Sequence, residues 1–259
     1  MRLRFSSKTL NLLVRSDVTC SLLVGYFSGR LRRVISKLSP AGENPELKQV
    51  LADFKAATEA HEYSHTWFDG SIPLWFELLK SVRNSEKSVE ILEIGSWEGR
   101  STVFLLSFLA NSRVTAVDTW EGGDEHQEYS GLSTNELRFD ANTAQFQNRI
   151  IKKKGLSSRI LSEMIVDKRE NFDVVFVDGS HFSDDVIVDS ALSWRLLKPN
   201  GIMIFDDYLW RYERYGWGRN PSKAVNLFLR LVRGDFELLH VGQQVAIRKT
   251  VSSSVYTDY

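Results

Sequence analysis

The sequence predicts an α/β fold in which a mainly parallel sheet carries helices on both faces. Three observations predict it. Short apolar segments alternate with longer segments of helical spacing, a glycine turn follows the first apolar segment, and the last two apolar segments stand too close together for a parallel crossover. With 259 residues the chain is long enough for one such domain and an extension.

Residues 1–42 are predicted to form a basic extension ahead of the folded domain, 43–259. Residues 1–40 hold eight Lys and Arg against the single acid Asp17, although the net charge of the whole chain is zero. An acid-poor start that contains Arg and Ser resembles an organelle transit peptide, and a partly disordered or membrane-grazing segment is the alternative. The cytoplasm is the expected location, and import through the basic segment is left open.

Two helices are predicted ahead of the sheet, at Glu43–Ala60 and at Ser71–Val82, with Ser71 as the cap of the second. These helices, within residues 43–84, are expected to cover the site. The parallel strands are then expected at Val89–Ile94, Val114–Val117, Ile150–Ile151, Val174–Val177 and Ile202–Phe205.

Two final strands, "FELLHV" at 236–241 and "QQVAIRK" at 243–249, follow the parallel ones. Little more than Gly242 separates them, so they are expected to pair as an antiparallel hairpin.

The first strand and its turn, "VEILEIGSWEGR", form the most informative segment. Glu93 lies near the carboxyl end of the strand, where open α/β sheets bind ligands, and Gly95 and Gly99 allow a sharp turn with close backbone approach. The dinucleotide fingerprint requires a central glycine, and Trp97 stands in its place. A purely structural turn explains the glycines, but explains the neighbouring acid less naturally.

The spacing Glu-x-Gly-x-x-x-Gly resembles the first motif of class I S-adenosylmethionine-dependent methyltransferases. That resemblance implies a Rossmann-like seven-stranded sheet whose last strand is antiparallel, with S-adenosyl-L-methionine as cofactor. By the same resemblance the methionine end of the cofactor is supported by Glu93, Gly95, Ser96, Trp97, Gly99 and Ser101.

The nucleoside end is assigned to residues after the second and third strands. The carboxylate of Asp118 can accept both ribose hydroxyls, although Asp118 alone is also consistent with NAD or with a simple turn. Trp120 is expected to flank the nucleoside, with ordinary packing as the alternative for it and for Trp97. Gly155 and Ser157 are predicted to form the adenine edge, unless Ser157 only caps a helix.

Three acids are expected to meet at the carboxyl ends of two neighbouring strands. Asp178 follows the fourth strand, and Asp206 and Asp207 follow the fifth. Adjacent strands lie about 4.8 Å apart, so the carboxylates would repel one another unless a cation joined them. The sequence therefore predicts a Mg²⁺ site at Asp178, Asp206 and Asp207, with turn or capping roles for the last two as the alternative.

This arrangement resembles metal-dependent O-methyltransferases of the catechol and macrolide-sugar types over roughly residues 61–250. The resemblance implies that Asp178 and His181 are catalytic, with His181, three residues beyond the acid, as the general base. The alternative for His181 is a polar residue at a helix start.

Aromatic residues are expected at the entrance to the site, where they suit a flat phenol or a sugar ring. They are His65, Trp67, Phe68, Tyr208, Trp210, Tyr212, Tyr215 and Trp217.

The function predicted from these motifs is Mg²⁺-assisted O-methylation of a small-molecule or sugar hydroxyl. An NAD-dependent oxidoreductase and a catalytically silent nucleoside-binding module are the alternatives.

The zero net charge argues against nucleic acid as a partner. Arg15 and Asp17 interrupt the apolar segment near the start, which argues against a membrane span. Assembly into a homo-oligomer is left open.

Overall fold

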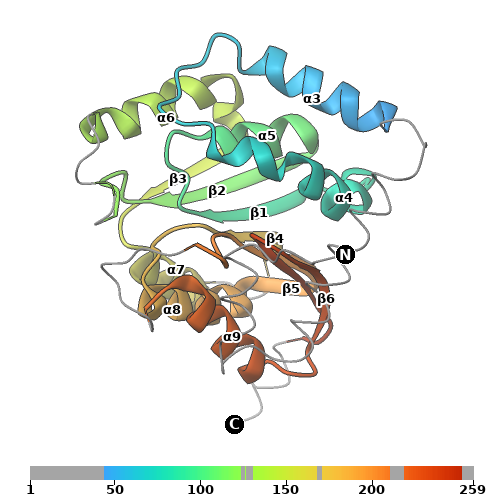
Figure 1. Cartoon of the computed structure of the whole chain (residues 1–259), viewed down its shortest axis with the longest axis vertical. Coiled ribbons are helices and arrows are strands. Elements are labelled where there is room, and N and C mark those ends of the chain that lie inside the picture. The colour runs from blue at the N-terminus through green and yellow to red at the C-terminus, as the bar shows by residue number, and fades with distance from the viewer. Residues whose placement is uncertain (1–43, 124–125, 127–130, 168–170, 211–218, 253–259) are drawn as a thin grey trace, which may run out of the picture.

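The computed structural model describes residues 44–123, 126, 131–167, 171–210 and 219–252. They form a seven-stranded sheet in the order β3-β2-β1-β4-β5-β7-β6, covered on both faces by helices (Figure 1). The predicted basic extension, residues 1–42, lies outside the described residues. The predicted α/β architecture is confirmed.

The five parallel strands begin where the sequence predicts or a few residues earlier. The register pairs β1 with β2 and β4, β2 with β3, and β4 with β5, all in parallel. Their bounds are β1 (Val89–Ile94), β2 (Ser112–Asp118), β3 (Ile150–Lys154), β4 (Phe172–Val177) and β5 (Leu197–Phe205).

The closing hairpin is also confirmed. Strand β6 (Phe236–Val241) pairs antiparallel with β7 (Val245–Lys249), and β7 inserts antiparallel between β5 and β6. The sheet therefore has a single antiparallel strand, β7, as the resemblance to class I methyltransferases implied.

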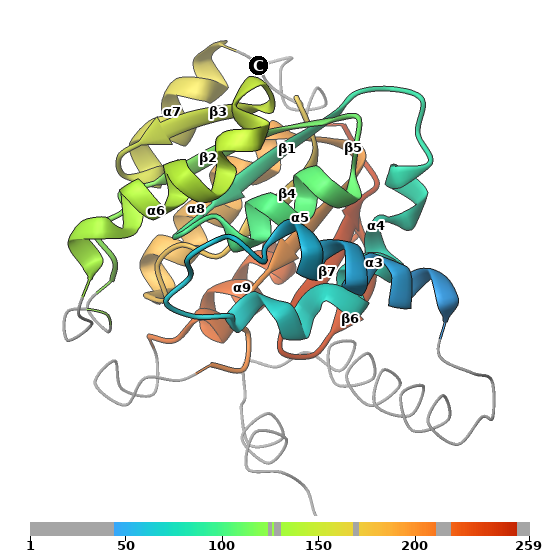
Figure 2. The same cartoon turned by 90° about the horizontal axis from the view of Figure 1, so that it is seen from above.

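The helices divide between the two faces of the sheet. Figures 1 and 2 show α3, α5 and α6 over one face, with α7, α8 and α9 on the other side in Figure 1. The helix bounds are α3 (Pro45–Ala57), α4 (Ile72–Arg83), α5 (Arg100–Phe108), α6 (Asn135–Thr143), α7 (Ser157–Asp167), α8 (Ser183–Leu196) and α9 (Pro221–Leu231), with short 3₁₀ turns at Trp67–Ser71, Leu132–Thr134 and Ala144–Arg149.

Alternating side chains of the central strands fill two separate cores. Ile91 of β1 packs in the core under α4 and α5, while its neighbour Leu92 packs in the core against α8 and α9. Both side chains are fully buried. This two-sided burial explains why the strands read as continuous apolar runs and not as alternating ones.

Asn44 caps α3, because its side-chain oxygen accepts hydrogen bonds from the backbone N–H groups of Glu46 and Leu47. Ser71 precedes α4 but makes no side-chain cap bond, so the predicted capping role is wrong. Pro73 lies in the first turn, where proline favours the start of a helix, so the helix begins without a side-chain cap bond. None of the helices in the described part of the chain combines the length and apolarity that a bilayer span requires.

Candidate active site

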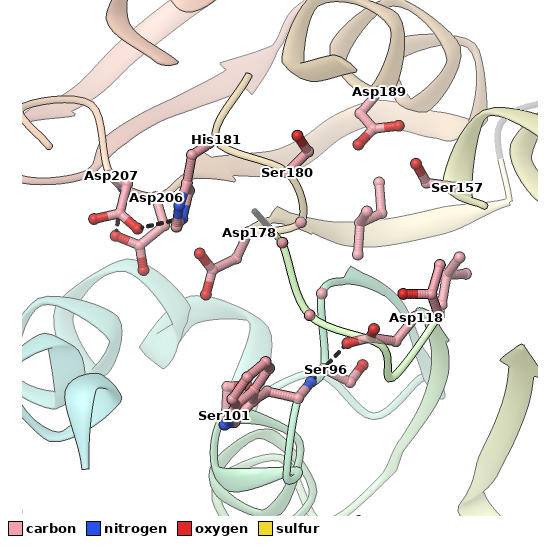
Figure 3. A pocket seen from close by; sticks show the side chains of 18 of the residues that line it. Ser96, Ser101, Asp118, Ser157, Asp178, Ser180, His181, Asp189, Asp206 and Asp207 are labelled. Atoms are coloured by element: carbon pink, nitrogen blue, oxygen red, sulfur yellow. Dashed lines mark hydrogen bonds and ion pairs between the residues drawn. The ribbon is translucent and has the colours of Figure 1, made fainter. Parts of the chain in front are cut away.

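A cavity of about 970 Å³ opens at the carboxyl ends of β1, β2, β4 and β5 (Figure 3). Most of the residues predicted for the site line it, and they come from turns that are far apart in sequence. The predicted residues that line the cavity are Gly95, Ser96, Trp97, Ser101, Asp118, Gly155, Ser157, Asp178, His181, Asp206 and Asp207.

The turn after β1 needs glycine at Gly95 for two independent reasons. Its φ of +85° lies in the left-handed region, and a Cβ at this position would stand 1.9 Å from the backbone oxygen of Asp178. Gly99, at φ +83°, begins α5 and would meet the Thr143 side chain at 2.8 Å if it carried a Cβ. Gly99 thus shapes the turn without lining the cavity.

Glu93 is fully buried beneath this turn, and it does not line the cavity. One carboxylate oxygen accepts a hydrogen bond from the Ser101 hydroxyl at 2.6 Å, and the other accepts one from Thr102. Burial raises the pKa of Glu93, and these hydroxyls oppose the rise. The carboxylate therefore anchors the first turn of α5, and Ser101 connects it to the cavity.

The Asp118 carboxylate joins the turns after β1 and β2. Its two oxygens accept the backbone N–H of Trp97 at 2.8 Å and that of Trp120 at 2.7 Å. Burial raises the pKa of Asp118, while the backbone donors favour its charged form. Asp118 is only partly buried and also lines the cavity, so a ligand there can contact it.

Both tryptophans adopt left-handed backbone conformations, with φ +47° at Trp97 and +58° at Trp120. Such conformations are costly for non-glycine residues and persist where surrounding contacts hold them. Here the Trp120 indole donates to the Trp97 carbonyl at 2.8 Å. Trp120 is otherwise buried beside Phe139 and under Lys152, so it supports the cavity wall from behind and does not line the cavity.

Gly155 and Ser157 lie together at the end of the cavity expected to bind the adenine. Ser157 lies beside the buried carboxylate of Asp189 on α8 (Figure 3). Asp189 lines the cavity and is absent from the residues predicted from sequence. The helical spacing could not identify Asp189 as a site residue, because a polar residue within a helix is equally consistent with a solvent-exposed position.

Asp178, His181 and Asp207 converge at the opposite end (Figure 3). Each offers one ligand atom, and these atoms all lie within 4.8 Å of one another. Nε2 of His181 lies 2.9 Å from Oδ2 of Asp207. Burial, followed by repulsion from Asp206 and Asp207, raises the pKa of Asp178 well above its ordinary value.

Asp206 lines the same end, but its oxygens have other partners. They accept the backbone N–H of Asp207 at 2.7 Å and the amide of Gln244 at 2.8 Å. Gln244 in turn accepts the indole N–H of Trp75 at 2.8 Å. Burial, with repulsion from Asp207, raises the pKa of Asp206 to about 7. Asp206 is therefore held in place by one hydrogen bond to each of its oxygens.

Aromatic rings surround the entrance. His65 stacks on Trp67 with centroids 4.1 Å apart, Trp97 lies 4.7 Å from His126, and Trp210 lies 4.3 Å from His181. Phe68 also lines the cavity. Tyr208 is buried away from it, with its hydroxyl 2.9 Å from the Asn226 side chain. Tyr212, Tyr215 and Trp217 lie outside the described residues.

The segment between α3 and α4 closes over the cavity through contacts that sequence reasoning missed. The buried carboxylate of Glu98 accepts the backbone N–H of Ser64 and a hydrogen bond from Arg138, both at 2.6 Å. Arg100 makes a bidentate pair with Asp69. Within residues 43–84, the residues that line the cavity come from this connecting segment. In the sequence, the only sign of these contacts was Glu98, an acid within the glycine turn.

Residues 92–208 match a sequence family described as "Methyltransferase domain". An uncharacterized protein of Acanthamoeba polyphaga mimivirus is 26% identical over 176 residues, which is 66% of this chain and 74% of that protein. Mycinamicin VI 2''-O-methyltransferase of Micromonospora griseorubida is 24% identical over 175 residues, 64% of this chain. The aligned region is only 38% of that enzyme.

Solved structures share the fold. The MycE methyltransferase of the mycinamycin pathway, in complex with Mg, SAH and mycinamycin VI, superposes with a TM-score of 0.52 at 18% identity, covering 76% of this chain and 54% of MycE. An O-methyltransferase from Bacillus cereus in complex with SAH gives 0.51 at 19% identity, covering 88% of this chain and 100% of that one.

The matched family covers the strands and turns that build most of the cavity, and the chain superposes on these structures across the sheet. Residues 92–208 thus match the methyltransferase-domain family, and the chain has the fold of the class I S-adenosylmethionine-dependent methyltransferases.

Proposed function

We propose that this protein transfers a methyl group from S-adenosylmethionine to a hydroxyl of a small molecule or sugar, with help from Mg²⁺. One observation carries the proposal: a single cavity has a ribose-type carboxylate, Asp118, at one end and the cluster Asp178, His181 and Asp207 at the other. The carboxyl ends of parallel strands are where this fold class binds and converts its ligands.

The turn after β1 suits the cofactor, as does the Asp118 carboxylate that joins this turn to the turn after β2. Gly95 brings the backbone close to the cavity, and Ser96, Trp97 and Ser101 line it beside that turn. Since Asp118 holds the two turns together and still faces the cavity, it can bind ribose while keeping the pocket in shape. S-adenosylmethionine supplies an electrophilic methyl group on a sulfonium sulfur.

The acids at the other end suit a hard divalent cation. Asp178 and Asp207 are partly buried and close together, and burial, followed by repulsion from the neighbouring carboxylates, raises the pKa of Asp178. Oxygen ligands are those that Mg²⁺ prefers, so we assign it to Asp178, Asp206 and Asp207. Mg²⁺ bound there would hold the acceptor oxygen and lower the pKa of its hydroxyl.

His181 is assigned as the general base and not as a metal ligand. Its imidazole suits softer metals better than Mg²⁺, whereas imidazole accepts protons near neutral pH. Asp207 orients the ring through the 2.9 Å contact with Nε2. In the transfer the acceptor oxygen forms a bond to the methyl carbon, the carbon–sulfur bond breaks, and the hydroxyl proton passes to His181.

The aromatic entrance supports a ring-shaped acceptor. Trp67 is more than half exposed and stacks with His65 beside the cavity, so a flat apolar face is available to a ligand. Both a phenol and the apolar face of a sugar fit such a surface. The macrolide-sugar activity of the similar mycinamicin enzyme favours a sugar.

Thermal unfolding with candidate ligands tests the cofactor assignment. S-adenosylhomocysteine at about 100 times its Kd adds about 2.7 kcal/mol to the free energy of unfolding, which raises Tm by roughly 5–10 °C. NAD at the same concentration is expected to leave Tm unchanged. Stabilisation by NAD alone would favour the oxidoreductase. Binding of S-adenosylhomocysteine without methyl transfer to any hydroxyl acceptor would favour the silent nucleoside-binding module.

A further inference from the structure

The turn between β6 and β7 carries a buried glutamine, Gln244, that the proposed mechanism does not use. Gln244 is only 2% exposed, and its side-chain amide has a partner at each end. The amide oxygen accepts the indole N–H of Trp75 on α4, and the amide nitrogen donates to Oδ2 of Asp206, both at 2.8 Å. Side chains from three separate elements therefore form one hydrogen-bonded chain, which ends at an acid of the proposed metal site.

Trp75 decides which way the Gln244 amide faces. A side-chain amide can present either its oxygen or its NH₂ group to a neighbour, whereas an indole N–H can only donate. The oxygen of Gln244 must therefore face Trp75, which leaves the NH₂ group to face Asp206. The Trp75 ring is fully buried and makes edge contacts with Phe68 and Phe176, so packing fixes the position of its N–H.

The other oxygen of Asp206 holds the backbone of Asp207. Oδ1 of Asp206 accepts the backbone N–H of Asp207 at 2.7 Å. Asp207 has a φ of +52°, in the left-handed region that is costly for residues other than glycine and persists where neighbouring groups hold it. From this backbone the Asp207 carboxylate reaches Nε2 of His181 at 2.9 Å (Figure 3). Gln244 therefore acts on the placement of Asp207 through Asp206.

We infer that Gln244 is a positioning residue for the proposed metal site: oriented by Trp75, it holds the Asp206 carboxylate, which in turn holds Asp207 in place. The inference rests on the proposed function and adds to it two residues that do not line the cavity, Gln244 and Trp75. Hydrogen bonds to ligating carboxylates orient them, and loss of such a partner typically lowers metal affinity by about 10- to 100-fold.

Mg²⁺ binding to the full chain, measured by isothermal titration calorimetry, tests the inference. Gln244→Met keeps a side chain of similar length but removes the amide, so the Kd of Mg²⁺ is expected to rise by about 10- to 100-fold. The Kd of S-adenosylhomocysteine is expected to stay within a few-fold, because the turn proposed to bind the cofactor is held by Asp118 and not by Gln244. A purely structural role would lower Tm and leave both constants of the folded variant unchanged.

Tyr208→Phe is the matched control. It removes a buried hydrogen bond from the same loop, the 2.9 Å contact with Asn226, but leaves Asp206 with both of its partners. Its Mg²⁺ affinity is expected to match that of wild type. If wild type binds Mg²⁺ and Gln244→Met binds it equally well, or if Tyr208→Phe loses as much affinity as Gln244→Met, the inference is overturned. If wild type binds no Mg²⁺, the metal assignment of the proposed function fails, and the inference fails with it.

Trp75→Phe tests the first link of the chain. Phenylalanine keeps an aromatic ring but has no N–H, so the Gln244 amide loses the donor that fixes its orientation, and the Kd of Mg²⁺ is expected to rise a few-fold. Because Trp75 acts through Gln244, the same change made in the Gln244→Met background is expected to have no further effect on this Kd. Independent, additive losses from the two changes would contradict the inference.

Wild type alone gives a further measurement, should the variants fold poorly. The side-chain amide resonance of Gln244 in the NMR spectrum is expected to shift as Mg²⁺ is added, in step with the calorimetric binding curve, because its hydrogen-bond partner Asp206 then binds the cation. An unchanged Gln244 resonance in protein saturated with Mg²⁺ overturns the inference without any variant.

Discussion

The backbone of Gly95 lies directly against the backbone carbonyl of Asp178, so that a Cβ on Gly95 would stand 1.9 Å from that oxygen. Strands β1 and β4 are neighbours, and the turn after each belongs to a different part of the cavity. The contact therefore couples the turn proposed to bind the cofactor to the first acid of the proposed metal site. A change in the backbone of either turn, at Gly95 or at Asp178, is therefore expected to displace both turns.

Replacement of Gly95 tests this coupling. Gly95→Ala is expected to lower the free energy of unfolding by about 2–5 kcal/mol, because the left-handed φ is unfavourable for alanine and the clash is with backbone. Urea unfolding measures the loss. Gly234→Ala is the matched control, since Gly234 also has a positive φ but open space at its Cβ. Equal losses in the two variants would show that the contact with Asp178 is unimportant.

His181 is expected to act on the chemical step alone. His181→Ala should reduce kcat by about 10²–10⁴-fold, the usual contribution of a general base, while the Kd of S-adenosylhomocysteine stays within a few-fold. The plot of kcat against pH should also lose the acidic limb that reports the base. A parallel loss of Tm and activity, with an unchanged pH profile, would instead assign His181 a structural role.

Mg²⁺ is expected to stabilise the protein through the acids. Millimolar Mg²⁺ should raise Tm of wild type, and Asp178→Asn should abolish that rise because one charged oxygen ligand is lost. EDTA should in addition suppress methyl transfer to a hydroxyl acceptor. Asp184→Asn, outside the cavity, serves as control. Unchanged activity in EDTA together with unchanged activity of Asp207→Asn would refute the metal assignment.

The metal-free protein is expected to gain stability as the pH falls from about 8 to about 5.5. Burial raises the pKa of Asp206 to about 7 and that of Asp189 to about 6, above the ordinary value of 3.8. In this window the folded state binds more protons than the unfolded state, so lowering the pH favours folding. The expected rise in Tm is on the order of 5 °C.

Thermal unfolding in EDTA across this pH range measures the effect. Asp206→Asn removes one of the groups whose pKa is raised, so the Tm of this variant should depend less on pH than that of wild type. A Tm of wild type that falls steadily over the same range, with the same slope in the variant, would contradict the burial argument for these carboxyls.

Much of the fold could be predicted because local pattern decides it. Continuous apolar runs marked the buried parallel strands, and the short spacing around Gly242 required an antiparallel hairpin. Ser71 shows the limit of such reasoning. A serine before a helix was read as a cap, but Pro73 already starts that helix and the serine makes no cap bond.

The candidate site was predicted where a residue's role follows from its place after a strand. Asp118 ends a strand and Asp178 and Asp207 closely follow one, and parallel strands bring such residues to one edge. Glu93 and Trp120 were predicted to contact the cofactor, yet both lie behind the residues that line the cavity. Glu93 turns to Ser101 and Thr102, and Trp120 packs on Phe139.

The sequence by itself determined the order of strands and helices, the glycine turn and the acids that follow the strands, because those depend on apolar periodicity and on backbone freedom at single residues. Only the tertiary structure decided which polar side chains face the cavity. Asp189 from α8 and Glu98 beneath Ser64 acquire their roles from neighbours distant in sequence. Hydrogen bonding across packed elements selects such positions, and no local pattern encodes it.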